Sequence, residues 1–239
     1  MTGHLDGTAT HDAPYRGIRV LDCGQGIASP YCGLLLAAHG ADVIKIEPPE
    51  GDWSRRLGTT YGRHTAMSAM VKRCKRSLCL DLKSTEGRAA GQRLAPDSDI
   101  CIEGFRPGVA ARLGLGYEDL SRANPRLIYL SVSGFGQSGP ASDRPCSDSV
   151  AQAFAGLVSV NRGEDGIPHR VGTPIADVAT GAYAFQAIGA ALFARDRVGV
   201  GRWIDISLTQ TTAALLGHKF AEHTLEGGVP RALNAPAGA

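Results

Sequence analysis

The chain has 239 residues, a length that suits one large domain able to bury a core of its own. Its 25 lysines and arginines nearly balance its 23 aspartates and glutamates, so the charge predicts neither a nucleic-acid partner nor a membrane partner. Residues 1–7 have no apolar core typical of a secretory signal, and the six cysteines have no metal-like spacing, which favours a reduced, cytoplasmic protein.

The first half of the chain alternates predicted strands and helices. Residues 1–15 are expected to form a flexible arm. After it we expect strands at 18–21, 42–47, 77–81 and 100–103, with helices at 30–38 and 84–94 between them. The loop region 48–75 is expected to carry one short helix. Because the strands are almost continuously apolar, the pattern predicts an α/β fold: a parallel sheet with helices on both faces.

The second half continues the alternation and ends in longer helices. The pattern predicts short helices at 109–113 and 117–122, a strand at 127–132, a helix at 148–158, a long apolar helix after Asp177, a strand at 202–207 and a helix at 208–225. The apolar stretch 178–194 is too short and too rich in Gly and Ala for a membrane span, so we expect a buried core helix. One domain at 16–226 and a linker at 227–239 complete the prediction.

A glycine-rich turn follows the first predicted strand. Gly24, Gln25 and Gly26 stand between strand and helix, and Glu47 ends the second strand about twenty residues later. In a dinucleotide site such glycines admit a pyrophosphate to a helix N-terminus and such an acid holds a ribose. Ser29 replaces the third glycine of that fingerprint. An ordinary strand–helix turn and a nucleotide-binding turn both remain open.

Basic residues gather near the carboxyl ends of the predicted strands. The run Lys72-Arg-Cys-Lys-Arg76 is either a solvated face or a phosphate patch. Lys83 follows one strand and Arg106 follows another, and parallel sheets bind ligands at that edge. Several cations at one edge favour a phosphorylated ligand.

Asp177 stands at the expected start of the long apolar helix. A carboxylate in that position is either a helix cap or a nucleophile. Asp148 is a second acid with which it could share acid–base work, although no spacing places the two together. The histidines form no ligand motif, since His218 and His223 fall on different helix faces, so no metal site is expected.

Several segments, in order along the chain, resemble class III CoA-transferases. They are Gly17-Ile-Arg-Val-Leu-Asp22, Gly40-Ala-Asp-Val-Ile-Lys-Ile-Glu-Pro-Pro49, Lys75-Arg-Ser-Leu-Cys-Leu-Asp-Leu-Lys-Ser84, Glu103-Gly-Phe-Arg-Pro-Gly108, Asn124-Pro-Arg-Leu-Ile-Tyr129 and Ser133-Gly-Phe-Gly-Gln-Ser-Gly-Pro140. The family includes formyl-CoA transferase, carnitine CoA-transferase and α-methylacyl-CoA racemase. The resemblance implies a Rossmann-like CoA-binding domain and reaches only the first half of a typical member, so the C-terminal small domain is expected to be absent.

The resemblance also implies a chemistry and a set of residues. Asp177 would be the nucleophile, forming a mixed anhydride with the acyl group of an acyl-CoA and then an aspartyl-CoA thioester. The residues matching positions around coenzyme A are Ala28, Leu80, Lys83, Phe105, Arg106 and Arg112. The implied partners are an acyl-CoA, a carboxylic acid, and either a second copy in an interlocked homodimer or a separate chain that supplies the missing half.

Two other functions stay open at this point. Racemases of the family carry a histidine where this chain has Ser147, and a serine cannot move an α-proton at neutral pH, so a transferase is favoured over a racemase. The other alternative is a truncated, non-catalytic CoA-binding module.

Overall fold

The computed structural model describes residues 13–227, which form a Rossmann-like α/β domain around a six-stranded sheet. All neighbouring strands in this sheet pair in parallel, in the order β5-β2-β1-β6-β7-β8. The strands are β1 (Arg19–Asp22), β2 (Asp42–Glu47), β5 (Arg76–Cys79), β6 (Ile100–Glu103), β7 (Ile128–Ser133) and β8 (Arg202–Ser207). The predicted parallel sheet is confirmed, and its strand order reverses beside β1.

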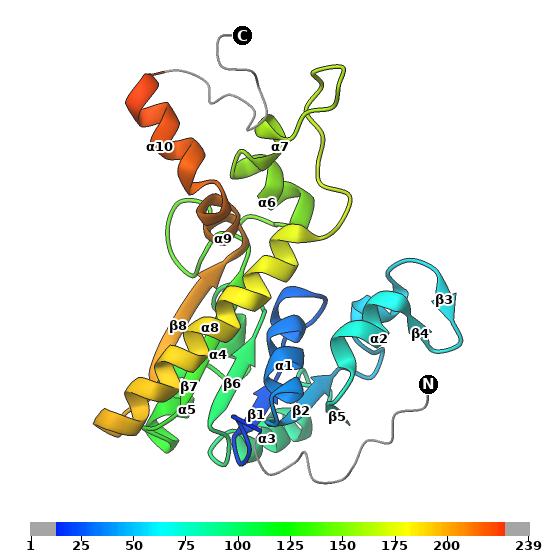
Figure 1. The fold of residues 1–239 in the computed structure, drawn as a ribbon. Coiled ribbons are helices and arrows are strands. Elements are labelled where there is room, and N and C mark those ends of the chain that lie inside the picture. The colour runs from blue at the N-terminus through cyan, green and yellow to red at the C-terminus, as the bar shows by residue number, and fades with distance from the viewer. Residues whose placement is uncertain (1–12, 228–239) are drawn as a thin grey trace.

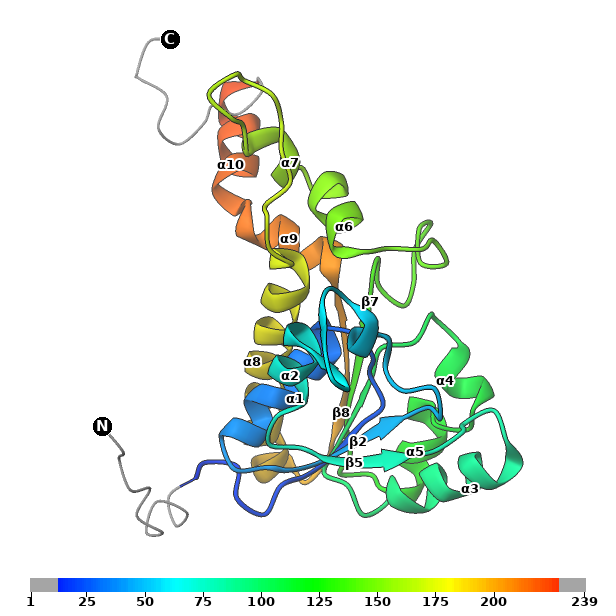
Figure 2. The same ribbon diagram turned by 90° about the vertical axis from the view of Figure 1, so that its right-hand side faces the viewer.

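Helices cover both faces of the sheet (Figures 1 and 2). One face carries α1 (Ala28–Ala38) and α8 (Ile175–Val198), which share a core of buried residues with the central strands. The other face carries α3 (Thr85–Leu94), α4 (Val109–Arg112) and α5 (Tyr117–Ala123), with a second core. Both cores are built on the same strands, which explains why β6 and β7 read as unbroken buried runs.

The segment between β2 and β5 contains more structure than the single short helix expected there. It forms a 3₁₀ helix, η1 (Trp53–Arg56), a small hairpin of β3 (Thr60–Tyr61) and β4 (His64–Thr65), and the helix α2 (Ala66–Lys72). Thr65 and Ser68 cap α2 with reciprocal side-chain bonds, a capping box that the Thr-x-x-Ser spacing encodes. The prediction of a single short helix in this segment was therefore wrong, because the segment holds two helices and a hairpin.

Two helices expected to be continuous are each broken in two. The helix expected at 148–158 is α6 (Asp148–Phe154) followed by α7 (Leu157–Val160), because Gly156 adopts a left-handed conformation with φ of 90°. The helix expected at 208–225 is α9 (Leu208–Leu215) followed by α10 (Gly217–Glu226), with a change of direction at Leu216. These helices extend beyond the sheet, beside the end of α8 that carries Asp177 (Figure 1).

Helix α8 begins at Ile175, so Asp177 lies in its first turn rather than ahead of it. By length and composition α8 could cross a membrane, and it is the helix in the described part of the chain that meets this test. Here it packs along α1 and the sheet, and its buried residues belong to the core. Its apolar composition is thus explained by packing, as expected for a core helix.

Other boundaries differ from the expected ones by one or two residues. Helix α1 starts at Ala28, two residues before Pro30, and β5 ends at Cys79 rather than at residue 81. Residues 1–12 of the expected arm and 228–239 of the expected linker lie outside the described residues. The last arm residue, Tyr15, packs its ring against Phe185 of α8, so the arm is anchored at that point.

Candidate active site

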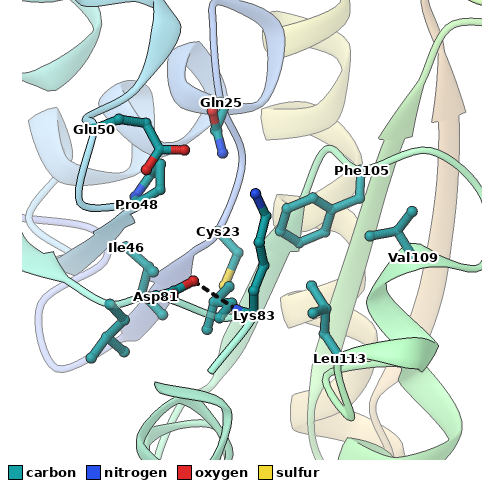
Figure 3. Close-up of a pocket in the computed structure, with 12 residues that line it drawn as sticks. Cys23, Gln25, Ile46, Pro48, Glu50, Asp81, Lys83, Phe105, Val109 and Leu113 are labelled. Carbon is teal, nitrogen blue, oxygen red and sulfur yellow. Dashed lines mark hydrogen bonds between the residues drawn. The ribbon is translucent and has the colours of Figure 1, made fainter. Parts of the chain in front are cut away.

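A cavity of about 300 Å³ opens at the carboxyl ends of the strands beside β1, where the strand order reverses (Figure 3). Parallel sheets bind ligands at such switch points. We call it the switch-point cavity; its lining residues are Cys23, Gln25, Ile46, Pro48, Glu50, Leu80, Asp81, Leu82, Lys83, Phe105, Val109 and Leu113. Lys83 is the cation among them, and its side chain extends into the cavity toward Gln25 and Phe105 (Figure 3). Two acids, Glu50 and Asp81, also line the cavity, and Asp81 accepts a bond from the Lys83 backbone N–H. The mainly apolar wall suits an aromatic group, and Lys83 is the lining side chain that could meet a phosphate.

The glycine turn after β1 separates this cavity from a second one. Gln25 lines the switch-point cavity, whereas Ile27, two residues later, lines the second. Gly26 has φ of 81°, and a Cβ atom there would lie 1.9 Å from the Trp53 ring. The glycine is therefore required by the turn conformation and by close packing against η1.

Buried charges hold this turn by its backbone. The Gly24 N–H donates to Asp22 at 3.0 Å, and the Gly24 carbonyl accepts from the Lys45 ammonium. The Gly26 N–H donates to Asp52 at 3.0 Å. All three charged side chains are 1% exposed or less, so the turn is fixed by interactions that water does not screen.

The structure corrects one interpretation of a charged residue near this turn and part of another. Glu47 accepts two bonds of 2.7 Å from Arg55 and lies 3.3 Å from Lys72, which is why its pKa falls to about 2 despite its burial. It is not free to hold a ribose. Lys72 and Lys75 likewise neutralise buried acids, with Lys75 2.8 Å from Asp22, so these two lysines form neither a solvated face nor a phosphate patch. Arg73 and Arg76 of the same run are exposed, so the solvated face is confirmed for them.

The second cavity, of about 390 Å³, contains Asp177. We call it the Asp177 cavity; it is lined by Ile27, Trp53, Leu57, Met67, Cys146, Ser147, Asp148, Ser149, Arg170, Gly172, Thr173, Pro174, Asp177 and Leu208. These residues come from the glycine turn, η1, α2, α6, the segment before α8, α8 itself and α9. Arg170 is the cation of this lining and could meet the carboxylate of an acid.

Asp177 and Asp148, which no spacing placed together, are in contact. The backbone N–H of Asp177 donates to Asp148 Oδ2 at 3.1 Å. Asp148 thus caps the first turn of α8 from a neighbouring helix, and the carboxylate of Asp177 is not the cap. Burial, and then the charge of Asp148, raises the pKa of Asp177 to about 7. Such a carboxylate is more basic, and so a better nucleophile, than an exposed one.

A third, smaller cavity, which we call the joining cavity, has a lining residue in common with each of the other two. It measures about 170 Å³ and shares Phe105 with the switch-point cavity and Cys146 with the Asp177 cavity. Arg106 and Arg144 also line it, and both are exposed. The three cavities thus follow one another from the carboxyl edge of β5 to Asp177, and we call this row of neighbouring cavities the path; its cations are Lys83, Arg106, Arg144 and Arg170. A long, anionic ligand could lie along this path with its reactive end at Asp177.

The model of CoA-transferase family III matches residues 15–238. The acetyl-CoA:oxalate CoA-transferase of Acetobacter aceti is 40% identical over 219 residues, which is 91% of this chain and 56% of that protein. This chain belongs to CoA-transferase family III.

A second family III relative is the beta subunit of the succinyl-CoA–L-malate CoA-transferase of Chloroflexus aurantiacus, 41% identical over 210 residues, or 87% of this chain and 52% of that one. A CAIB/BAIF family protein from Brucella suis superposes with a TM-score of 0.86 at 34% identity, covering 92% of this chain and 60% of the other. The chain therefore spans about half the length of the curated relatives it matches.

The structure brings most of the residues predicted for this family III chain onto one path. Leu80, Lys83 and Phe105 line the switch-point cavity, and Arg106 lines the joining one. Ala28 and Arg112 line none of the three cavities. Ala28 is 5% exposed in the core, and Arg112 ends α4 next to Gly108.

Sequence reasoning missed several residues that line the Asp177 cavity or hold its wall from behind. Trp53 and Arg170 lie in loop-rich segments whose path no local pattern predicts. Gln152 is fully buried and donates to Asp148, one turn earlier on α6. The spacing of four residues between Asp148 and Gln152 could have predicted this contact, because residues at i and i+4 lie on the same face of a helix.

Metal ligation has no support in the described part of the chain. Among residues 13–227 no group of three or more His, Cys, Asp or Glu side chains is placed to hold an ion. The six cysteines, all within these residues, are free thiols.

The raised pKa of Asp177 predicts how stability depends on pH. Its value rises from 3.8 to about 7 on folding, so between about pH 4 and pH 7 the folded state holds more protons than the unfolded state. The contribution of this group to stability therefore falls as the pH rises through that window. We expect Asp177→Asn to raise the melting temperature at pH 8, and to raise it less at pH 5, in scanning calorimetry. Asp196→Asn, which changes an exposed acid of the same helix, should show no such difference. An unchanged melting temperature of Asp177→Asn at pH 8 would contradict the raised pKa.

Proposed function

We propose that this family III protein transfers coenzyme A between carboxylic acids, with Asp177 as the covalent acceptor of the acyl group. One observation carries the proposal: a carboxylate of raised pKa lies at the end of a path that begins in a cavity suited to a nucleotide. An acyl-CoA has the matching layout, since its adenosine phosphates and its thioester are joined by a long, flexible arm.

The proposed reaction exchanges one anion for another at each step. The Asp177 carboxylate attacks the thioester carbon of the donor, and the C–S bond breaks to give a mixed anhydride and CoA thiolate. The thiolate then attacks the Asp177 carbonyl carbon and releases the donor acid as its carboxylate. An acceptor carboxylate repeats both steps in reverse, which forms the new acyl-CoA and restores Asp177. No net proton transfer is needed, because the reacting groups are all anions: the Asp177, donor and acceptor carboxylates and the CoA thiolate.

The CoA phosphates are proposed to lie near Lys83, Arg106 and Arg112, with Leu80 and Phe105 against the adenine. Ala28 would contribute backbone contact beside the glycine turn. Lys83 lines the switch-point cavity and not the Asp177 cavity. Its charge would therefore serve binding and not the chemical step.

We expect Lys83→Gln to weaken acyl-CoA binding about 10-fold with kcat changed less than about twofold, because one charge-assisted bond is lost in the ground state and the transition state alike. Calorimetric titration with CoA and steady-state kinetics measure the two effects. Arg93→Gln removes the same charge from an exposed site on α3 outside the cavity and serves as the control. Equal CoA affinities of the two variants would place the phosphates elsewhere.

A racemase is disfavoured by the position of Ser147. Its hydroxyl caps α6 by accepting from the Val150 N–H at 3.4 Å, and a serine hydroxyl does not exchange α-protons at neutral pH. Deuterium exchange at the α-carbon of a 2-methylacyl-CoA, if faster than CoA transfer, would reverse this choice.

We also propose that the active unit contains more than one chain, either a homodimer or this chain with a separate one. Large apolar side chains such as Phe154 (62% exposed), Phe193 (62%) and Phe220 (50%) stand on the surface of this chain. Native mass spectrometry at micromolar concentration tests the proposal. A monomer that binds CoA without turnover would instead identify a non-catalytic CoA-binding module.

A further inference from the structure

Gln152 is a fully buried glutamine that the proposed mechanism does not use. It lies on α6, one turn after Asp148, and none of the three cavities is lined by it. A buried amide is costly unless its polar atoms are bonded, and both atoms of this amide are. Its hydrogen bonds connect three separate segments of the active site.

The first partner is Asp148. The Gln152 Nε2 donates to Asp148 Oδ1, while Asp148 Oδ2 accepts from the backbone N–H of Asp177 at 3.1 Å. Both oxygens of the Asp148 carboxylate are thus fixed, one from its own helix and one from the first turn of α8. With both bonds made, Asp148 cannot rotate away from Asp177 without leaving one donor unpaired.

The second partner is the segment before α8. The Val171 N–H donates to Gln152 Oε1 at 2.8 Å. This segment carries Arg170 and Thr173 to the wall of the Asp177 cavity. One amide therefore ties the cavity wall, the Asp148 carboxylate and, through Asp148, the start of α8.

We propose that Gln152 is a positioning residue that holds Asp148 against the first turn of α8 and so keeps the two carboxylates together during acyl transfer. The proposal rests on the proposed role of Asp177 as the nucleophile. When Asp177 becomes an anhydride or a thioester it loses its charge, and the repulsion from a fixed Asp148 is relieved. A fixed Asp148 thus destabilises the free carboxylate relative to the acylated states, which favours acylation.

Few charged and titratable groups surround Asp177, so the repulsion from Asp148 can be measured through the pKa of Asp177. Asp148 faces it from α6, Cys146 from the loop before α6, and Arg170 from the segment before α8; the parts of the glycine turn, η1, α2 and α9 that line the cavity are uncharged. Without Gln152, Asp148 would be free to turn away from Asp177. The loss of its negative charge from this position lowers the pKa of Asp177 toward its ordinary value.

The test replaces Gln152 by a side chain of similar length that cannot donate or accept. In Gln152→Met we expect the amide hydrogen of Asp177 to exchange at least about 10-fold faster, because its acceptor is released. We expect kcat to fall about 10-fold or more while KM for the acyl-CoA changes less than about twofold, and the acid limb of the kcat profile to move to lower pH. NMR hydrogen exchange and steady-state kinetics measure these effects on the full chain.

A second variant serves if Gln152→Met does not fold. Gln152→Glu keeps the acceptor for Val171 and loses the donor to Asp148, so the Asp177 amide hydrogen should again exchange faster.

A matched control is available at the opposite edge of the sheet. Asn124 also joins separate segments through its amide, donating to the Ser98 carbonyl at 2.9 Å and accepting from the Arg126 N–H at 3.0 Å. Asn124→Leu should lower the melting temperature, but it should leave the exchange rate of the Asp177 amide hydrogen, kcat and the pH dependence of kcat unchanged. An unchanged Asp177 amide in Gln152→Met would overturn the proposal, as would faster exchange with an unchanged kcat in an active protein. If the parent chain shows no transfer at all, the proposed function fails on that result, and the amide exchange still decides the positioning.

Discussion

Asp177→Ala is expected to abolish CoA transfer, with kcat reduced at least about 10⁴-fold, because the variant has no atom that can carry the acyl group. Asp148 is the other carboxylate in the lining of the Asp177 cavity, and it is already held in place as a cap of α8. Asp148 has both oxygens bonded, to Gln152 and to the Asp177 backbone N–H. Binding of the acyl-CoA should remain, and it should tighten slightly where the acyl group no longer meets a buried negative charge.

Trapping separates this role from a purely structural one. During turnover of the parent protein, hydroxylamine should convert an acylated Asp177 to its hydroxamate, which mass spectrometry locates in the peptide that contains the start of α8. The control is Asp196→Ala, an exposed acid near the far end of the same helix, and it should keep full activity. Undiminished transfer by Asp177→Ala with several acyl-CoA donors would remove Asp177 from the mechanism.

Much of the fold could be predicted because parallel strands buried on both faces leave a simple pattern. The apolar runs at β2, β6 and β7 are bounded by turn residues, and the structure places each within one residue of its predicted position. Helix breaks were harder to predict. Gly156 ends α6 through its left-handed conformation, but a glycine inside an apolar helical pattern often continues the helix.

The candidate site was predictable only where it follows the sheet edge. Lys83 and Phe105 follow β5 and β6, so topology alone brings them to one cavity. The contact between Asp148 and Asp177 joins residues 29 apart in the sequence through a cap that neither helix encodes by itself. The roles of Lys72 and Lys75 were missed for a related reason: they pair with acids from three other segments, and a run of basic residues says nothing of where those acids lie.

Lys45 is at the centre of that buried charge network and carries the largest expected effect on stability. Its ammonium lies 3.9 Å from Asp22 and 3.6 Å from Asp52, and all three side chains are 1% exposed or less. Burial alone would raise the pKa of Asp22, yet Lys45, Lys75 and the Gly24 N–H hold it below its usual value. The network is thus charged when folded, and each acid depends on its cations.

Lys45→Met should therefore lower the free energy of unfolding by about 3–5 kcal/mol at pH 7, because two buried carboxylates then share one cation fewer: Asp22 keeps only Lys75 and Asp52 keeps only Lys72. For a domain of this size the melting temperature would fall by roughly 6–20 °C. Because Asp22 and Asp52 can then take up protons, the deficit should shrink as the pH is lowered from 7 to 5, in denaturant titrations at both pH values. Arg76→Met is the matched control, since it breaks an ion pair with Asp42 whose side chains are 66% and 48% exposed, and it should cost less than about 1 kcal/mol. The same substitution should also affect binding. The glycine turn would lose the bond from Lys45 to the Gly24 carbonyl, so any Lys45→Met protein that folds should bind CoA more weakly.

The comparison with Arg76→Met decides what holds the turn. If both substitutions lower the free energy of unfolding equally, the buried charges do not hold this turn, and its conformation comes from Gly26 and Trp53 alone.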